Sequence, residues 1–476
     1  AFVCSHATIR PFCLTADEMA KAPASLKAAD TKPKASEYKF TMAVSPLDCM
    51  GCGECVTVCP TKAIEMKPQE SQSEQQAAFD YCVENIRKKD NIPGVVSEVS
   101  VKGSQFNQPL LEFSGSCAGC AETSYARLIT QLFGEKMFIS NATGCSSIWG
   151  GTASISPYTT NKESGHGPAW INSLFEDNAE HGLGMQIGYE TIRENLLKKV
   201  EAMKGKSEAL DAAIAKFIET KANTKLNDQP AKDLTAALEA DGSAEAQEIL
   251  KDKQYLAKKS FWIFGGDGWA YDIGYGGLDH VLASGRDVNV MVFDTEMYSN
   301  TGGQASKASN IGEVCQFAAA GKEISKKSLA EICMTYGYIY VAQIALGANM
   351  AQAVKAIAEA EAYPGPSIII GYAPCELHGV KGGMTNCQNE MKKAVEAGYW
   401  NLFTFNPANK AQGKNPFTLT SKAGDMSKYQ DFLNNETRYS RLARAFPERA
   451  KELFEKNQAA ADARYEHLTR LVELYK

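Results

Sequence analysis

The sequence predicts an α/β fold in which a mainly parallel sheet is flanked by helices and preceded by a smaller, cysteine-rich α+β domain. Short apolar runs at 261–264, 288–293 and 367–372 alternate with helical segments such as 350–360. Buried parallel strands joined by crossover helices give this pattern. Four closely spaced cysteines between residues 49 and 59 mark the smaller domain.

Composition divides the chain into three segments. Residues 1–65 are punctuated by cysteine and form the smaller domain, which we expect to be incomplete at its N-terminal side. Residues 66–109 are polar and are expected to form a linker that begins with a surface helix. Residues 110–476 hold the sheet, with a helical insertion at 190–258 that is rich in Ala, Lys, Glu and Leu. Proline at 447 starts a predicted amphipathic helix in a C-terminal helical extension.

Net charge, hydropathy and cysteine content exclude several classes of protein. The net charge of −6 and the lack of a basic stripe argue against nucleic acid as a partner. No apolar run reaches the roughly 18 residues of a membrane span, and the first residues do not resemble a signal peptide. Fourteen cysteines without a secretion signal favour metal or cluster ligation in a reducing compartment, so we expect a cytoplasmic protein. Outside any grouping, we expect Cys82, Cys315, Cys333 and Cys387 to be buried as small apolar residues.

The strongest motif is Cys49-x2-Cys52-x2-Cys55-x3-Cys59-Pro60. This spacing is that of bacterial ferredoxins, in which three cysteines bind one [4Fe–4S] cluster and the fourth binds a second cluster. A tight turn must direct three thiolates at one face of the cluster, and the two intervening glycines allow that turn. Zinc sites generally use pairs of cysteines, so they fit this spacing less well.

Cys4 is the predicted fourth ligand of the cluster that Cys49, Cys52 and Cys55 bind. It resembles the last cysteine of an earlier run whose first three members would precede residue 1, although Ser5 stands where proline is usual. Cys59 then serves a cluster whose other ligands are not in this sequence. We therefore expect the chain to be a fragment of a longer polypeptide.

Four further cysteines are dispersed along the larger domain. Cys117 and Cys120 form a lone C-x-x-C, Cys145 lies in a Gly/Ser-rich loop, and Cys375 comes just after the apolar run 367–372. On residue pattern alone they could form a four-thiolate cluster site. The equal alternative is a redox dithiol at 117 and 120, with the other two simply buried.

A Gly-Asp-Gly segment at 266–268 follows the apolar run 261–264 and precedes a helical stretch that starts at Trp269. Glycines let the backbone approach a diphosphate, a helix N-terminus favours its negative charge, and an aspartate is a hard oxygen ligand for Mg²⁺. Alone, this segment is a common and weak signal.

The next predicted strand ends in Asp294-Thr295-Glu296-Met297, which strengthens the signal. Thiamine diphosphate enzymes place Gly-Asp-Gly and an Asn-Asn pair at a similar separation on adjacent strand ends. We expect Asp267, the Thr295 hydroxyl and the Met297 carbonyl to bind Mg²⁺ that bridges to thiamine diphosphate. A nucleotide-binding loop of another kind is the alternative, but neither G-x-G-x-x-G nor G-x4-G-K-[ST] occurs in this region.

Several motifs together give a specific resemblance. The segments 114–123, 172–180, 294–304 and 398–402, with both cofactor signatures, resemble the C-terminal portion of the pyruvate:ferredoxin (flavodoxin) oxidoreductases along essentially the whole chain. The resemblance implies oxidative decarboxylation of pyruvate with coenzyme A to acetyl-CoA and CO₂. Electrons would pass through [4Fe–4S] clusters, three in the full enzyme, to ferredoxin or flavodoxin.

The resemblance also implies roles for individual residues. Cys117, Cys120, Cys145 and Cys375 would hold a third cluster next to thiamine diphosphate, and Glu122 and Asn300 would be catalytic. Contacts to pyruvate and coenzyme A would lie mostly in absent N-terminal domains, and the enzyme is expected to be a homodimer. The residues expected to line the cofactor are Glu122, Cys145, Gly266, Asp267, Gly268, Trp269, Thr295, Glu296, Met297, Tyr298, Ser299 and Asn300.

Three alternatives stay open at this point. A sister enzyme could act on another 2-oxoacid, such as 2-oxoglutarate, with the same thiamine chemistry. A pyruvate:NADP⁺ enzyme would carry a flavin reductase domain after Lys476. A non-catalytic iron–sulfur electron-transfer module is the least favoured, because such a module has no need of the Gly-Asp-Gly strand pair.

Overall fold

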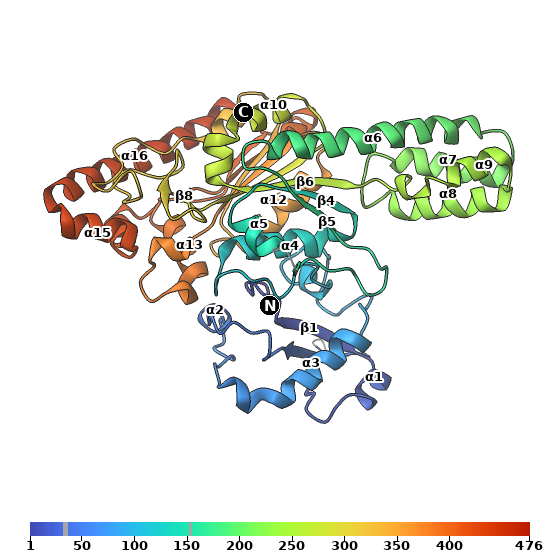
Figure 1. The fold of residues 1–476 in the computed structure, drawn as a ribbon, viewed down its shortest axis with the longest axis horizontal. Coiled ribbons are helices and arrows are strands. Elements are labelled where there is room, and N and C mark those ends of the chain that lie inside the picture. Colours follow the sequence, from blue (N-terminus) through green and yellow to red (C-terminus); the bar gives the residue numbers. More distant parts are fainter. Residues whose placement is uncertain (32–36, 152–154) are drawn as a thin grey trace.

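The computed structural model describes residues 1–31, 37–151 and 155–476, and it confirms the predicted α/β architecture (Figure 1). The described residues form an eight-stranded sheet in the order β13-β12-β10-β11-β7-β6-β4-β5. The strands from β10 to β5 are parallel, and β12 and β13 add an antiparallel edge. The bounds are β4 (Met137–Asn141), β5 (Ala169–Asn172), β6 (Ser260–Gly266), β7 (Asn289–Asp294), β10 (Tyr340–Ile344), β11 (Ser367–Tyr372), β12 (Phe403–Phe405) and β13 (Phe417–Leu419).

The three apolar runs became the central strands β6, β7 and β11. Every residue of β7 and β11 is buried, as expected for strands covered on both faces. Helices pack around the sheet and, with it, form one continuous hydrophobic core. They are α4 (Ala121–Phe133), α5 (Cys145–Gly150), α10 (Tyr275–Ala283), α11 (Leu329–Met334), α12 (Met350–Ala362), α13 (Cys387–Glu396), α14 (Tyr429–Asn434), α15 (Thr437–Ala445) and α16 (Pro447–Leu474).

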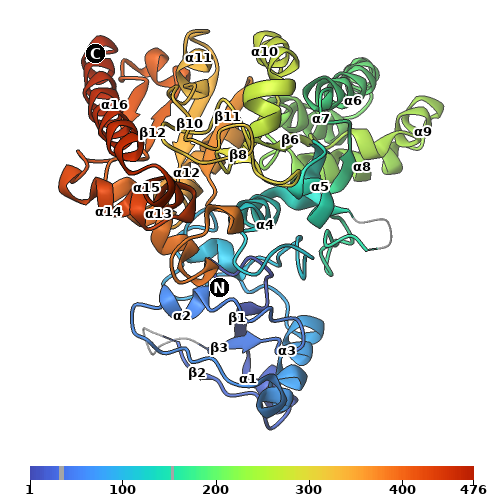
Figure 2. The same cartoon turned by 60° about the vertical axis from the view of Figure 1, so that its left-hand side comes forward.

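The N-terminal domain contains a small antiparallel sheet in the order β1-β3-β2 and lies below the central sheet in Figure 2. The helix predicted within 66–109 exists as α3, and it buries Phe79 and Cys82 against the small sheet. A surface helix in a linker would not contribute to a core in this way. The elements are β1 (Ile9–Leu14), α1 (Ala16–Ala20), β2 (Ala29–Asp30), β3 (Lys39–Val44), α2 (Glu54–Thr57) and α3 (Ser73–Asn85).

The segment 190–258 is helical and projects from one side of the sheet (Figure 1). Its helices have a hydrophobic cluster of their own that includes Leu210, Ile214, Phe217 and Leu234. The elements are α6 (Asn178–Ala202), α7 (Glu208–Thr220), α8 (Asp228–Asp241) and α9 (Ala244–Leu250). The insertion therefore has a core of its own, separate from that of the sheet.

The predicted C-terminal amphipathic helix is α16, which begins with Pro447 and buries Leu453, Phe454 and Leu468. Among the helices in the described ranges, none combines the length and apolar character needed to cross a membrane.

Candidate active site and cluster-binding residues

Four adjacent parallel strands, β4, β6, β7 and β11, carry the predicted site at their carboxyl ends. The register pairs Asn141 with Phe264, Gly266 with Phe293, and Tyr372 with Asp294, so the strands end nearly level. The loops that follow them contain Cys145, Asp267, Thr295 and Cys375, in that strand order. Ligands of open α/β sheets bind at this edge.

The oxygen atoms of the predicted metal site lie together. The Thr295 hydroxyl Oγ1 is 2.9 Å from Asp267 Oδ1 and 3.0 Å from the Met297 carbonyl oxygen. Neighbouring ligands of an octahedral Mg²⁺ with bonds of about 2.1 Å are about 3.0 Å apart, by simple geometry. The Thr295 hydroxyl is therefore spaced from each of the other two oxygens as neighbouring ligands of such a shell are.

Asp267 is fully buried and is oriented by its neighbours. The Thr295 backbone N–H donates to Oδ1 at 3.1 Å, and the Ser306 hydroxyl donates to Oδ2 at 2.6 Å. Burial first, and then the nearby Asp294 carboxylate, raise the pKa of Asp267 well above its usual value. A divalent cation at this position would offset both effects, which fits a donor set of one carboxylate and two neutral oxygens.

Asp294, the residue that replaces the first Asn of the Asn-Asn pair, binds side chains of two other segments. Its Oδ1 accepts from Lys326 Nζ at 2.9 Å, and its Oδ2 accepts from Tyr271 at 2.7 Å. Gly268 is needed for close approach, because a Cβ there would lie 2.6 Å from the Tyr298 ring. These contacts fix the two loops against each other.

The dispersed thiols gather beside these loops. Cys120, Cys145 and Cys375 influence one another electrostatically, and Cys117 acts on Cys375. Burial, as the largest cause, raises the pKa of Cys375 to about 11 and raises the pKa of Cys120 and Cys145 as well. Burial of these three thiols together is unfavourable for thiolates without a cationic partner, whereas Cys117 is exposed.

The loop at 295–300 reaches from the oxygen site to these thiols. The Ser299 hydroxyl is 2.6 Å from Thr295 Oγ1, and it also lowers the pKa of Cys375 through a side-chain contact. Asn300 lowers the pKa of Cys145 in the same way. One short loop thus connects the predicted metal site with the predicted third cluster site.

Glu122 lies near the thiols at the N-terminus of α4. Its Oε2 accepts a hydrogen bond from Trp149 Nε1 at 2.9 Å, and burial raises the pKa of Glu122 to about 7. Trp269, predicted to line the cofactor, is fully buried. Its ring crowds Gly265 and Gly274, where an added Cβ would lie 2.3 Å from it. Trp269 therefore packs beneath the loop.

The predicted cluster ligands of the N-terminal domain lie near one another. Cys52 is within electrostatic range of Cys4 and Cys55, and Cys55 is within range of Cys4 and Cys49. The Cys4 sulfur accepts from the Thr8 backbone N–H at 3.4 Å. Backbone donors of this kind are typical of cluster-bound sulfurs.

Cys59 lies at the end of the same run, where its sulfur accepts from the Ala63 backbone N–H at 3.3 Å. Within the described ranges, no three His, Cys, Asp or Glu side chains are close enough to hold a single metal ion. A cubane cluster needs wider sulfur spacing than a single ion does, since each thiolate binds a different iron.

The ungrouped cysteines Cys82, Cys315, Cys333 and Cys387 are all buried, which confirms the prediction that they act as small apolar residues of the interior.

A cavity of about 720 Å³ lies elsewhere, between the N-terminal domain and residues of α4 and α12, and none of the predicted site residues lines it.

Sequence reasoning missed the residues that hold the loops in place. They are Trp149, Ser306, Lys326, His378, Tyr399 and Arg438, which contact site residues from distant parts of the chain. Tyr399 lies in the segment 398–402 that carries part of the resemblance, but no motif assigned it a contact, and no local motif marks the other five, so only the tertiary fold reveals these contacts.

The fold and the strand-end loops define a thiamine diphosphate-binding domain joined to an iron–sulfur domain. Two family models match in agreement: "4Fe-4S binding domain" at residues 42–65, and "Thiamine pyrophosphate enzyme, C-terminal TPP binding domain" at residues 246–370. The cofactors are therefore [4Fe–4S] clusters and thiamine diphosphate.

Curated relatives confirm the more specific resemblance. The chain is 49% identical, over 99% of its length, to pyruvate-flavodoxin oxidoreductase of Klebsiella pneumoniae, of which it covers 40%. It is also 49% identical, over 99% of its length, to pyruvate:ferredoxin oxidoreductase of Moorella thermoacetica, of which it covers 41%. This sequence thus resembles a portion of the pyruvate:ferredoxin (flavodoxin) oxidoreductases.

A mitochondrial pyruvate dehydrogenase [NADP(+)] of Euglena gracilis is 46% identical over 99% of the chain, which covers 26% of that protein. The chain spans about two fifths of the first two relatives and about a quarter of this one. A solved 2-oxoglutarate:ferredoxin oxidoreductase from Magnetococcus marinus is 16% identical with a TM-score of 0.33, covering 55% of this chain and 64% of that one. That likeness is too low to support an argument.

Proposed function

We propose that this chain is the cluster-bearing and thiamine diphosphate-binding part of an enzyme that oxidises pyruvate with coenzyme A to acetyl-CoA and CO₂. Electrons leave through [4Fe–4S] clusters to ferredoxin or flavodoxin. The observation that carries the proposal is the 295–300 loop, which joins the oxygen site at Asp267, Thr295 and Met297 to the thiols of Cys145 and Cys375. A decarboxylation centre and an electron acceptor would then be neighbours.

The protein's contribution to the cofactor site is position and charge. Asp267, the Thr295 hydroxyl and the Met297 carbonyl would hold Mg²⁺, and the glycines 266 and 268 would let the backbone approach the diphosphate. Thiamine diphosphate, when bound, supplies the electron sink for decarboxylation of a 2-oxoacid.

Glu122 and Asn300 are the proposed catalytic side chains. The Glu122 carboxyl, with its pKa raised to about 7, can hold a proton at its oxygen near neutral pH. Asn300 has an amide at the cluster side of the cofactor loop, where it can orient a bound group. We place Glu296, Tyr298 and Ser299 among the residues that line the cofactor.

The cysteines form the electron path in this proposal. Cys117, Cys120, Cys145 and Cys375 would hold the cluster next to the cofactor. Cys4, Cys49, Cys52 and Cys55 would hold the next, and Cys59 would join one whose other ligands lie in a preceding part of the polypeptide. The enzyme is proposed to be a cytoplasmic homodimer that needs that preceding part for its contacts with pyruvate and coenzyme A.

Two related functions differ in substrate or acceptor. Another 2-oxoacid would use the same site. The similarity to the Euglena protein is the observation that favours the second function, with NADP⁺ as the final acceptor. A pure electron-transfer module does not account for the oxygen site at Asp267.

Anaerobic steady-state kinetics of the full-length protein tests the proposal. We expect kcat/KM to be highest for pyruvate among pyruvate, 2-oxoglutarate and branched-chain oxoacids, with ferredoxin or flavodoxin as acceptor. A higher kcat/KM for another oxoacid, or turnover with NADP⁺ alone, would contradict it.

A further inference from the structure

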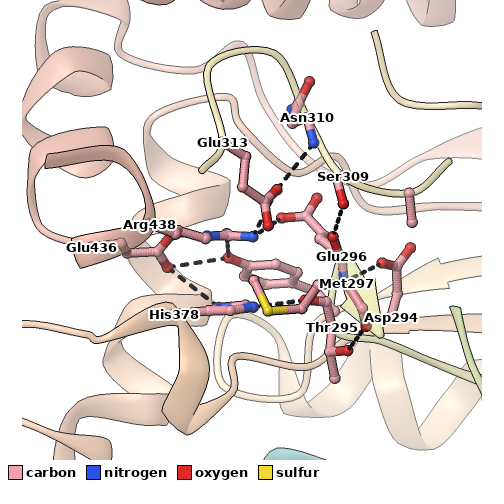
Figure 3. A network of polar contacts seen from close by, with 12 residues as sticks. Asp294, Thr295, Glu296, Met297, Ser309, Asn310, Glu313, His378, Glu436 and Arg438 are labelled. Carbon is pink, nitrogen blue, oxygen red and sulfur yellow. Dashed lines mark hydrogen bonds and ion pairs between the residues drawn. The ribbon is translucent and has the colours of Figure 1, made fainter. Parts of the chain in front are cut away.

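A buried network of charged groups lies behind the cofactor loop, centred on Arg438 at the start of α15 (Figure 3). The Arg438 side chain is 1% exposed, and its Nη1 lies 2.8 Å from Glu296 and 3.3 Å from Glu313. Its Nε donates to Glu436 at 2.7 Å. The two Nη1 contacts are ion pairs by distance but lack hydrogen-bond angles.

Glu296 is the loop residue that this network binds most directly. Its φ of 61° lies in the left-handed region, which is unfavourable for a residue with a side chain. One carboxylate oxygen pairs with Lys326 Nζ at 3.1 Å, and the other accepts from the Tyr399 hydroxyl at 2.5 Å. These partners hold the reversal of the chain between Thr295 and Met297.

His378 makes the direct contact with the loop. Its Nε2 is 2.7 Å from the Thr295 carbonyl oxygen, and the ring is fully buried. A carbonyl can only accept, so Nε2 must carry the proton. Nδ1 has no hydrogen-bond partner and lies 3.8 Å from Glu436, which also binds Arg438.

His378 also belongs to the segment of a predicted cluster ligand. It ends the short 3-10 turn Glu376–His378, whose first residue follows Cys375. One turn therefore extends from a thiol of the third cluster site to the backbone of the metal loop.

We propose that His378 is a positioning residue: its Nε2–H fixes the Thr295 peptide so that the Thr295 hydroxyl and the Met297 carbonyl stay in the arrangement that Mg²⁺ and the diphosphate require. The inference rests on the proposed function of that loop. It assigns the imidazole no contact with substrate or metal.

The physical basis of this role is the free-energy cost of a buried carbonyl that has no hydrogen-bond donor. Without its donor, the Thr295 carbonyl would have no partner in this buried position, so the peptide would turn toward another donor. Rotation of that peptide moves Thr295 Oγ1 and Met297 O away from the 3.0 Å spacing they now have. Mg²⁺ is sensitive to such a change because it demands near-octahedral geometry.

Calorimetric titration of the full-length protein, freed of thiamine diphosphate, tests the proposal with thiamine diphosphate and Mg²⁺ as the probe. His378→Leu should weaken binding about tenfold or more, in line with a lost buried hydrogen bond. His378→Gln, whose amide can donate to the same carbonyl, should restore most of the affinity. His467→Leu is the matched control, because His467 pairs with Glu331 at the surface and should leave affinity unchanged.

Iron content and thermal midpoint are measured on every variant, so that a folding defect is recognised. If His378→Leu does not fold, the comparison of His378→Gln with His378→Asn tests the role of His378. The Asn amide is too short to reach the carbonyl, so the Asn variant should bind thiamine diphosphate weakly. Unchanged affinity in the Leu or Asn variant, or equal loss in the Gln variant, would overturn the role of His378 while wild type still binds. Failure of the wild type itself to bind thiamine diphosphate would instead overturn the proposed function.

Discussion

At the residue scale, the oxygen spacing around Thr295 is the feature that matters most. A single hydroxyl contacts the Asp267 carboxylate and the Met297 carbonyl at 2.9 and 3.0 Å. A reversed turn at Glu296, with φ of 61°, makes this possible by turning the Met297 carbonyl back toward Thr295. Local strain is thus concentrated where the ligand geometry is needed.

Asp267→Asn tests the metal role of this carboxylate. The amide keeps the size of the side chain but loses the charge that Mg²⁺ prefers in its ligands. We expect thiamine diphosphate binding in the presence of Mg²⁺ to fall about a hundredfold, by calorimetry, while iron content stays unchanged. Asp233→Asn, on the exposed insertion, is the control. Normal affinity of Asp267→Asn for thiamine diphosphate would contradict the assignment of Asp267 as a Mg²⁺ ligand.

Sequence spacing identified Asp267, Thr295 and Met297, because strand ends and their first loop residues form a local pattern. It did not identify His378 or Arg438. Their roles come from contacts between segments that meet only after folding, and neither lies in a motif with a fixed spacing.

At the scale of elements, long apolar runs predicted the central strands well. β11 has the predicted bounds, and β7 differs by one residue at each end. The antiparallel edge strands β12 and β13, of three residues each, were not predicted, because so short a segment carries no period.

Helix α12 also carries a buried carboxyl against the sheet. Glu361 Oε2 accepts from Ser260 at 2.5 Å, Trp262 at 3.1 Å and Asn289 at 3.2 Å. Burial is the first cause that raises the pKa of Glu361 to about 7, and Asp287 also raises it while Lys258 lowers it. The folded protein therefore keeps this proton at a pH where the unfolded chain has lost it.

The sign of the pH effect follows from this difference. The folded-state pKa is raised, so its contribution to stability is complete below the unfolded value of about 4.5 and is lost as pH rises through about 7. The full loss is on the order of 3 kcal/mol.

Glu361→Gln should remove that loss, because its amide oxygen can accept from the same three donors and does not ionise. Thermal midpoints of the cluster-loaded protein between pH 5.5 and 8 measure the effect. The variant should gain stability relative to wild type as pH increases. Parallel pH curves for the two proteins would contradict this account.

At the scale of the whole molecule, one segment joins the iron–sulfur domain to the predicted third cluster site. Thr57 of α2 donates to the Thr385 carbonyl at 2.8 Å, and Gln388 donates to Glu54 at 3.4 Å. The same segment touches the C-x-x-C turn, where a Cβ on Gly119 would lie 2.8 Å from the Met384 carbonyl. The N-terminal domain thus docks through residues 384–388 beside the predicted third cluster site.

Composition predicted the cysteine-rich segment, the helical insertion and the sheet as separate regions. It could not predict how they dock, since the docking contacts are single polar residues without a repeated pattern. The domain boundaries at 65 and 109 stay predictions, and the packing of α3 against the small sheet indicates that the N-terminal domain extends beyond residue 65.

The central claim is that a cluster held by Cys117, Cys120, Cys145 and Cys375 takes electrons directly from the thiamine site. Anaerobic electron paramagnetic resonance of the full-length protein, with iron analysis, tests it most directly. Cys145→Ser should lose about four irons, and pyruvate should no longer reduce the remaining clusters, although dithionite still does. Cys333→Ser, at a buried cysteine outside any predicted cluster, should keep both properties. A full iron content and normal pyruvate-dependent reduction in Cys145→Ser would contradict the account.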